Sequence, residues 1–95
     1  MPTLRIEHAI VDFALWKSAF DRFAEVRERA GVLRHRIHRP VDDPAYVLID
    51  LDFATVGEAE GFLQFLRQQV WASPGAAPAL VGTPMTRIVE PVGAA

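Results

Sequence analysis

The sequence contains no cysteine, which excludes disulfide bonds, thiolate metal centres, iron–sulfur clusters and cysteine nucleophiles. It also lacks an excess of either charge, because ten basic residues stand against twelve acidic ones and the net charge is −2. We therefore expect no surface devoted to nucleic acid or to anionic membrane. No apolar run approaches the roughly eighteen residues of a membrane span, and the first residues lack a signal-peptide pattern, so we expect a cytoplasmic protein.

The 95 residues are 51% hydrophobic and 23% charged, which is typical of a single globular domain. We expect this domain to cover residues 1–95, with a frayed tail at 92–95. Hydrophobic periodicity predicts strands over 4–10, 32–39 and 46–53, and a last strand near 85–90. It predicts helices from Asp12, a helix cap, to Gly31, and from Thr55 to about Val70.

The predicted order of elements is βαββαβ, which indicates an α+β, ferredoxin-like fold. Right-handed crossovers then give a four-stranded antiparallel sheet with two helices on one face. The other face of the sheet is left uncovered, so it meets either water or a partner.

The segment "RHRIHRP" at 34–40 is rich in basic residues, but its alternation points to ion pairing within the sheet. If the hairpin pairs Pro40 with Tyr46, Arg36 lies opposite Asp50 and Arg34 lies opposite Asp52. A register shifted by one residue would destroy these matches. The arginines are then neutralised by the neighbouring strand, which disfavours nucleic-acid binding.

The same register also matches apolar side chains and argues against a metal site. Ile37 is predicted to meet Ile49, and Leu33 to meet Phe53, on the side that faces the helices. His35 and His38 point to opposite sides of a regular strand and cannot chelate one ion. We expect no bound metal.

Four stretches resemble the dimeric α+β barrel superfamily, in particular its small members related to antibiotic-biosynthesis monooxygenases and polyketide cyclases. They are "VDFALWKSAFDRF" (11–23), the strand that follows "RERAGV" (27–32), "DDPAYVLIDLDF" (42–53) and "GEAEGFLQFL" (57–66). The resemblance implies a homodimer whose sheets pack face to face, and a cavity between each sheet and its own helices. It also implies activities that range from cofactor-free oxygenation of polyaromatic substrates to cyclisation, haem handling or none known. The asparagine–tryptophan–histidine set of haem-degrading relatives is incompatible with this sequence, which has no asparagine.

His8 and His35 are the candidate catalytic residues, because both are expected to point toward the helices. A histidine between apolar walls can act as a general base toward a phenol, and no cofactor is then needed. The alternative is a core histidine whose ring is satisfied by a backbone carbonyl. Candidate ligand-binding residues on the first helix are Trp16, Phe20 and Phe23, for which packing in the core is the alternative.

Residues 68–86 contain no charged side chain. They include a long predicted loop at 73–84. Trp71 and Leu80 make this segment a candidate subunit contact or a lid over a ligand, with an ordinary loop as the alternative.

Two functions follow from the sequence. One is a small apolar or aromatic ligand bound between sheet and helices, as in a cofactor-independent monooxygenase or cyclase. The other is a non-catalytic dimeric module with a structural or regulatory role.

Overall fold

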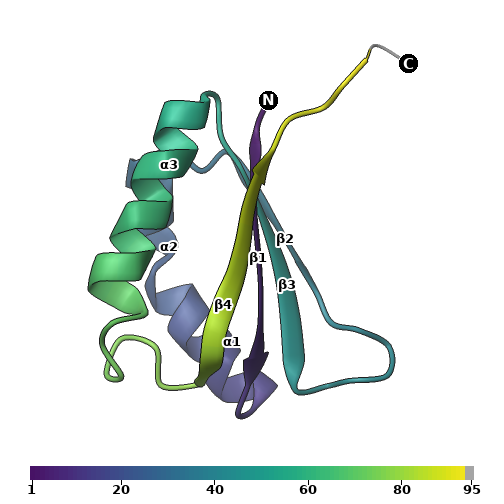
Figure 1. Ribbon diagram of the computed structural model, residues 1–95. Coiled ribbons are helices and arrows are strands. Elements are labelled where there is room, and N and C mark those ends of the chain that lie inside the picture. The colour runs from purple at the N-terminus through teal and green to yellow at the C-terminus, as the bar shows by residue number, and fades with distance from the viewer. Residues whose placement is uncertain (94–95) are drawn as a thin grey trace.

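The computed structural model describes residues 1–93 and has a four-stranded antiparallel sheet covered on one face by helices (Figure 1). The strand order β2-β3-β1-β4 is the ferredoxin-like arrangement predicted from the sequence. The elements in chain order are β1 (Thr3–Ile10), α1 (Phe13–Arg22), α2 (Ala24–Ala30), β2 (Arg34–His38), β3 (Tyr46–Asp52), α3 (Val56–Phe65), the π-helical turn η1 (Leu66–Val70) and β4 (Leu80–Val89). The expected frayed tail at 92–95 lies partly outside the described residues.

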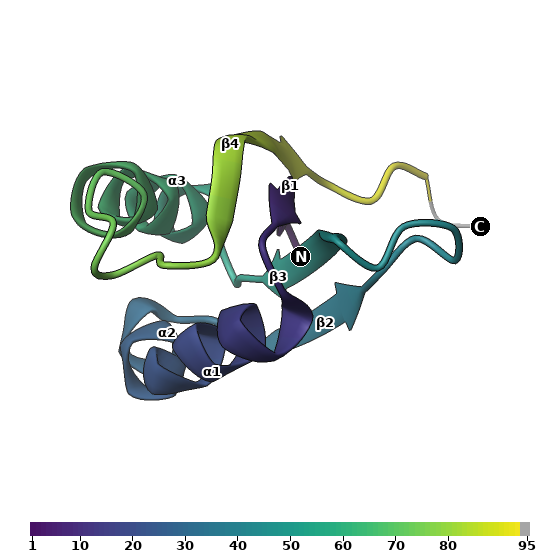
Figure 2. The ribbon, with the colours of Figure 1, turned by 90° about the horizontal axis from the view of Figure 1, so that it is seen from below.

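The core lies between the helices and the inner face of the two central strands. Alternation along β1 and β3 sends every second side chain inward, where it becomes almost fully buried. Figure 2 shows α1 and α2 over one half of this face and α3 over the other. The largest fully buried side chains are Leu4, Val47, Leu51 and Phe53. In residues 1–93 no helix has the length and apolar character needed to cross a bilayer.

The predicted register of the β2–β3 hairpin is confirmed. Arg34 lies opposite Asp52, Arg36 opposite Asp50 and Ile37 opposite Ile49. The predicted inward position of Leu33 is wrong, because this residue precedes β2 and is 57% exposed. β2 is an edge strand, and its start lies beyond the cover of the helices.

The prediction of one helix between residues 12 and 31 is also wrong, because the chain breaks at Phe23 into α1 and α2. The Phe20 carbonyl at the break accepts a bond from the Phe23 amide at 3.2 Å. It accepts a second bond from the Arg27 guanidinium at 2.5 Å. A side chain thus supports the carbonyl at the interruption, while the apolar spacing continues through both helices.

The last strand begins at Leu80 rather than near Met85, so the preceding loop is shorter than predicted. Pro84 lies inside β4, where its missing N–H is tolerated because β4 is an edge strand. The pairing with β1 shifts between Glu7 and Ala9, next to Gly82 with a φ of 72°. This irregularity lets the strand continue past a proline and a glycine that read as loop in the sequence.

Gly31 ends α2 with a φ of 98° and lies against the first turn of α3. A Cβ atom there would lie 2.5 Å from the Glu58 Oε2 atom. We expect Gly31→Ala to lower the free energy of unfolding by about 1–2 kcal/mol, through left-handed strain and this contact. Gly61→Ala is the matched control, since it meets nothing within 4 Å in α3 and should raise stability by about 0.5–1 kcal/mol. Urea unfolding that moves both variants in one direction would contradict this reading of the two sites.

Candidate functional site

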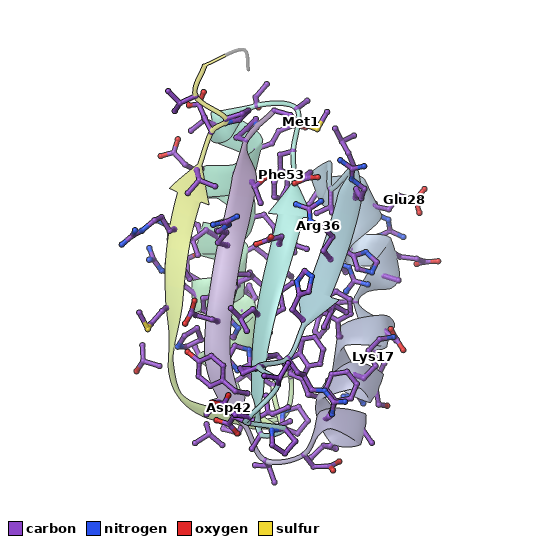
Figure 3. The ribbon with its side chains drawn as sticks, turned by 90° about the vertical axis from the view of Figure 1, so that its right-hand side faces the viewer. Met1, Lys17, Glu28, Arg36, Asp42 and Phe53 are labelled. Atoms are coloured by element: carbon purple, nitrogen blue, oxygen red, sulfur yellow. The ribbon has the colours of Figure 1, made fainter. Side chains whose placement is uncertain are left out.

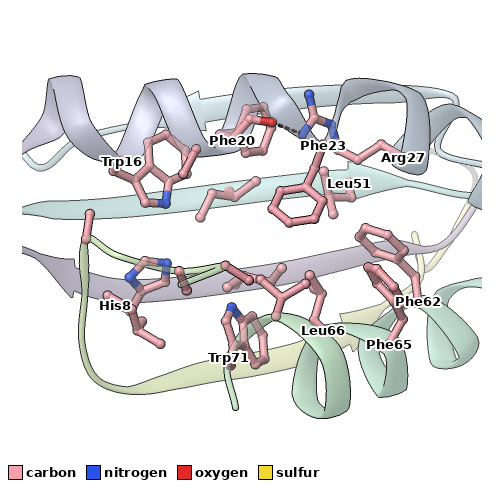
Figure 4. Close-up of a pocket in the computed structure, with 18 residues that line it drawn as sticks. His8, Trp16, Phe20, Phe23, Arg27, Leu51, Phe62, Phe65, Leu66 and Trp71 are labelled. Atoms are coloured by element: carbon pink, nitrogen blue, oxygen red, sulfur yellow. Dashed lines mark hydrogen bonds between the residues drawn. The ribbon is translucent and has the colours of Figure 1, made fainter. Parts of the chain in front are cut away.

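A mainly apolar cavity of about 90 Å³ lies between the inner face of the sheet and the helices. Figure 4 shows its two walls, with the α1–α2 side above and α3 with η1 below, and the central strands between them. Its lining combines predicted site residues with further core positions: Ile6, His8, Trp16, Ala19, Phe20, Phe23, Arg27, Ile49, Leu51, Phe62, Phe65, Leu66, Val70, Trp71, Ala76, Ala77, Ala79 and Leu80.

One wall carries a row of aromatic rings along α1. Helical spacing of three and four residues aligns Phe13, Trp16 and Phe20 on the face that turns toward the sheet. The ring centroids of Phe13 and Trp16 are 5.7 Å apart, and those of Trp16 and Phe20 are 5.0 Å apart and stacked. The Arg27 guanidinium lies 3.6 Å from the centroid of Phe20 and continues the row. The wall is therefore preorganised by contacts between aromatic rings and by Arg27, which also donates a hydrogen bond to the Phe20 carbonyl.

His8 is the one candidate histidine that reaches the cavity. It lies on the inner side of β1, is 6% exposed, and its ring meets Trp16 edge-on at a centroid distance of 6.5 Å. The Nδ1 atom is 2.9 Å from the Ala9 carbonyl oxygen. Because a carbonyl oxygen only accepts, Nδ1 carries the proton, and Nε2 of the neutral ring is left with a free lone pair.

The protonation state of His8 also suits a base. Burial lowers the pKa of His8, and the hydrogen bond to Ala9 opposes this only in part. The imidazole is therefore neutral at pH 7. This is the state in which Nε2 can take a proton from a bound molecule.

His35 is not brought together with His8. It lies on the edge strand β2, is exposed, and its ring packs edge-on against Phe20 at 5.3 Å, outside the cavity lining. Partial burial lowers the pKa of His35, with the charges of Arg27 and Lys17 acting in the same direction. His35 lies on the predicted side of β2, the side that faces the helices. Because β2 is an edge strand, the side chain is nevertheless exposed.

The opposite wall comes from η1 and the loop that follows it. The Trp71 amide donates to the Leu66 carbonyl at 2.7 Å, the i to i−5 bond that defines a π turn. This turn places Leu66, Val70 and Trp71 together on the cavity side. The loop at 72–79 closes the same side with three alanines, and Leu80 follows at the start of β4.

All five predicted ligand-binding residues lie in the lining, from Trp16 and Phe20 on one wall to Trp71 on the other. Sequence reasoning missed Arg27, which is 7% exposed although arginine is rarely buried. Burial lowers the pKa of this guanidinium, and the charge of Asp21 raises it. The sequence shows that Phe62, Phe65 and Leu66 are apolar residues at helical spacing. It does not show that they border a cavity, because this depends on how the helices pack.

The uncovered sheet face, turned to the viewer in Figure 3, divides into a charged half and an apolar half. At the charged half, the Asp52 carboxylate accepts two bonds from Arg36, at 2.9 and 3.0 Å. Thr3 and Arg34 bind the same carboxylate at 2.7 and 3.3 Å. The apolar half contains Ala9, Tyr46, Leu48, Val81 and Met85, with Glu7 and His38 as its ionisable members. The Glu7 carboxylate there accepts a bond from the Tyr46 hydroxyl at 2.8 Å. Within residues 1–93 no group of three or more His, Asp or Glu side chains is placed to hold a metal ion.

Comparison with solved structures gives a consistent picture. A cofactor-independent oxygenase from Streptomyces nogalater superposes with a TM-score of 0.70 at 18% identity, covering 98% of this chain and 94% of the other. A Streptomyces coelicolor monooxygenase, solved with the ligand nanaomycin D, gives 0.63 at 17% identity over 99% and 89%. A dimeric ferredoxin-like protein from an uncultured marine organism gives 0.64 at 13% identity over 93% and 94%. The chain shares the ferredoxin-like α+β fold of these proteins.

The resemblance seen in the sequence is thus confirmed at the level of the fold. At identities of 13–18% these superpositions show the fold alone and leave the chemistry to the residues of this chain. No family model matches the sequence. No curated protein matches it either.

Proposed function

We propose that this protein binds a small hydroxylated aromatic molecule between its sheet and helices and oxidises it without a cofactor. The observation that carries the proposal is the free Nε2 atom of a buried, neutral His8 at an otherwise apolar cavity. The solved structures with the same fold include a cofactor-independent oxygenase and a monooxygenase, which supports this choice of chemistry.

The role of each wall follows from its side chains. His8 takes the proton of a phenolic hydroxyl, and the electron-rich phenolate then reacts directly with oxygen. One oxygen atom enters the ring, which becomes a quinone, and the other leaves as water, so the substrate supplies all the electrons. Trp16 and Phe20 stack against the ring of the substrate and exclude water from it.

Ligand entry requires one wall to move. The cavity of about 90 Å³ is smaller than the roughly 150 Å³ apolar cavity that accepts benzene in another protein. The loop at 72–79 is the wall that can yield, because it lies outside regular structure and carries only small side chains toward the cavity. This loop is proposed to act as the lid predicted from the sequence.

The binding step is tested by an NMR titration with 2-naphthol. We expect the signals of His8, Trp16 and the loop at 72–79 to shift together, because they border the same cavity. Signals of the uncovered face, such as those of Leu48, are the internal control and should stay unchanged. Shifts confined to the uncovered face, or no shifts at all, would contradict the proposed ligand site.

The uncovered sheet face is proposed to pack against a second copy of the chain. Its apolar half exposes Met85 at 65% and Val81 at 44% on the edge strand β4, and a solved structure of the same fold is dimeric. Met85→Glu should weaken the dimer at least tenfold, since it places a second carboxylate opposite Glu7 of β1 within the packed face. Leu15→Glu, on the outer side of α1 where Leu15 is 42% exposed, is the control.

Sedimentation equilibrium measures this effect directly. The proposal requires two chains per particle for the wild type and for Leu15→Glu, with single chains appearing in Met85→Glu. A wild-type protein that sediments as one chain would contradict it, and so would equal dissociation constants for the two variants.

A non-catalytic dimeric module is the second candidate, favoured by the small volume of the cavity. In that case the cavity is a packing defect and His8 a core residue held by Ala9. The module predicts a dimer that binds no aromatic probe. The titration with 2-naphthol therefore separates the two candidates, whereas the measurement of assembly does not.

A further inference from the structure

Both tryptophans of the chain direct their indole N–H groups toward the cavity. Figure 4 shows the indole nitrogen of Trp16 on the side that faces His8, and that of Trp71 on the side that faces the middle of the cavity. The two rings come from opposite walls, one from α1 and the other from the end of η1. Together with the Nε2 atom of His8 from β1, two donors and one acceptor converge on one apolar space.

Neither indole N–H is used by the fold. Within residues 1–93 no hydrogen bond to these nitrogens is present, and no fully buried side-chain nitrogen lacks a partner. The two N–H groups therefore border open space rather than packed atoms. A tryptophan N–H can only donate, and when buried it usually finds an acceptor. No group of the walls is bonded to them, so the acceptor is water or an atom of a ligand that enters the cavity.

We propose that Trp16 and Trp71 are specificity residues that donate their indole N–H groups to an oxygen atom of the ligand. The cavity then selects an aromatic ring that bears a carbonyl or hydroxyl oxygen over a hydrocarbon of the same shape. This inference rests on the proposed function, because it assumes that an aromatic ligand occupies the cavity. A site built to donate hydrogen bonds discriminates against an analogue that cannot accept them, since its donors then stay unpaired.

The same donors fit the proposed proton transfer. When His8 takes the proton of a hydroxyl group, negative charge develops on that oxygen in an apolar space. N–H groups already directed at the site stabilise such an oxyanion without rearrangement. Trp16 is the donor whose nitrogen faces His8, the group proposed to take the proton.

The test compares acetophenone with α-methylstyrene, in which a CH₂ group replaces the carbonyl oxygen and the shape is kept. The protein has two tryptophans, so a ¹⁵N–¹H spectrum contains two indole signals, which Trp16→Phe and Trp71→Phe assign. We expect acetophenone to bind at least fivefold more tightly and to move the indole protons downfield, while α-methylstyrene leaves them nearly unchanged. Trp71→Phe should reduce the difference in affinity while binding of α-methylstyrene is retained.

The possible failures are distinguishable. Equal affinities for both probes, with unchanged indole signals, would overturn the role of the two tryptophans while leaving the aromatic cavity intact. Binding of neither probe would overturn this inference together with the proposed function. The comparison of the two probes uses the wild-type protein, so it does not depend on the folding of either variant.

Discussion

Replacing His8 with glutamine is expected to lower the rate of oxygen uptake with hydroxynaphthalene substrates by about 10²–10⁴-fold. A glutamine side-chain amide can still donate a hydrogen bond to the Ala9 carbonyl, which His8 now binds at 2.9 Å. The variant therefore keeps the polar contact and loses the free lone pair of Nε2. An oxygen electrode measures the rate, and circular dichroism verifies that the fold persists.

The pH profile gives an independent check on His8. Burial lowers the pKa of His8 below its ordinary value of 6.5, so the free base dominates at neutral pH. We expect the rate to be constant above about pH 7 and to fall as the pH drops through the lowered pKa. The same shift makes protonation of His8 destabilising, because the folded state binds the proton less readily than the unfolded chain.

His35→Gln is the matched control for these experiments. The sequence assigned His35 the same role as His8, but the ring lies outside the cavity lining and packs on the far side of Phe20. We expect this variant to retain the wild-type rate within about twofold, as is usual for an exposed side chain away from the reacting groups. Full activity in His8→Gln, or a large loss in His35→Gln alone, would contradict the assignment of the base.

The fold was readable from the sequence because several local signals agreed. The caps at Asp12 and Thr55 accept bonds from the Leu15 and Glu58 amides at 2.8 and 3.2 Å. The register of β2 on β3 was fixed by two independent patterns, charge opposite charge and apolar opposite apolar. Local chemistry of this kind depends little on the packing of distant elements.

The errors arose where tertiary contacts override a local pattern. Nothing in the residues around Phe23 marks a helix break, because the apolar spacing continues and no proline or glycine is present. The interruption is stabilised by the buried side chain of Arg27, which reaches back seven residues to the Phe20 carbonyl. Pro84 read as loop, yet it is compatible with β4 because an edge strand leaves alternate N–H groups unpaired.

The site was only partly readable for a related reason. Alternation and helical spacing show which side chains point inward, and they correctly directed His8 toward the helices and Trp16 toward the sheet. They do not show whether side chains fill the space between the sheet and the helices. They also do not show that β2 lies at the edge of the sheet and leaves His35 exposed. The direction of the two indole N–H groups depends on side-chain rotamers, for which the sequence carries no signal.

Replacing Asp52 with asparagine is expected to lower the free energy of unfolding by about 2 kcal/mol at pH 7. This carboxylate is buried on the charged half of the sheet face and accepts hydrogen bonds from three side chains, Arg36 and Thr3 with the shortest distances. These bonds hold the pKa of Asp52 far below its ordinary value, with the bond from Arg36 as the largest cause. Asparagine has one acceptor oxygen and no charge, so it leaves part of the arginine cluster uncompensated.

The pH dependence of this loss identifies its cause. A carboxylate whose pKa is depressed in the folded state stabilises the protein above its unfolded pKa of about 3.9 and ceases to do so as the pH falls toward the folded value. Urea unfolding at one fixed protein concentration should therefore separate wild type from Asp52→Asn at pH 7, and the difference should shrink steadily as the pH falls below about 4. Asp50→Asn is the control, because Asp50 makes longer contacts with Arg5 and Arg36, at 3.4 and 3.7 Å, and its loss should stay below about 1 kcal/mol. Equal effects of the two substitutions, or a difference that persists at low pH, would show that the charge of Asp52 is not what stabilises this half of the sheet.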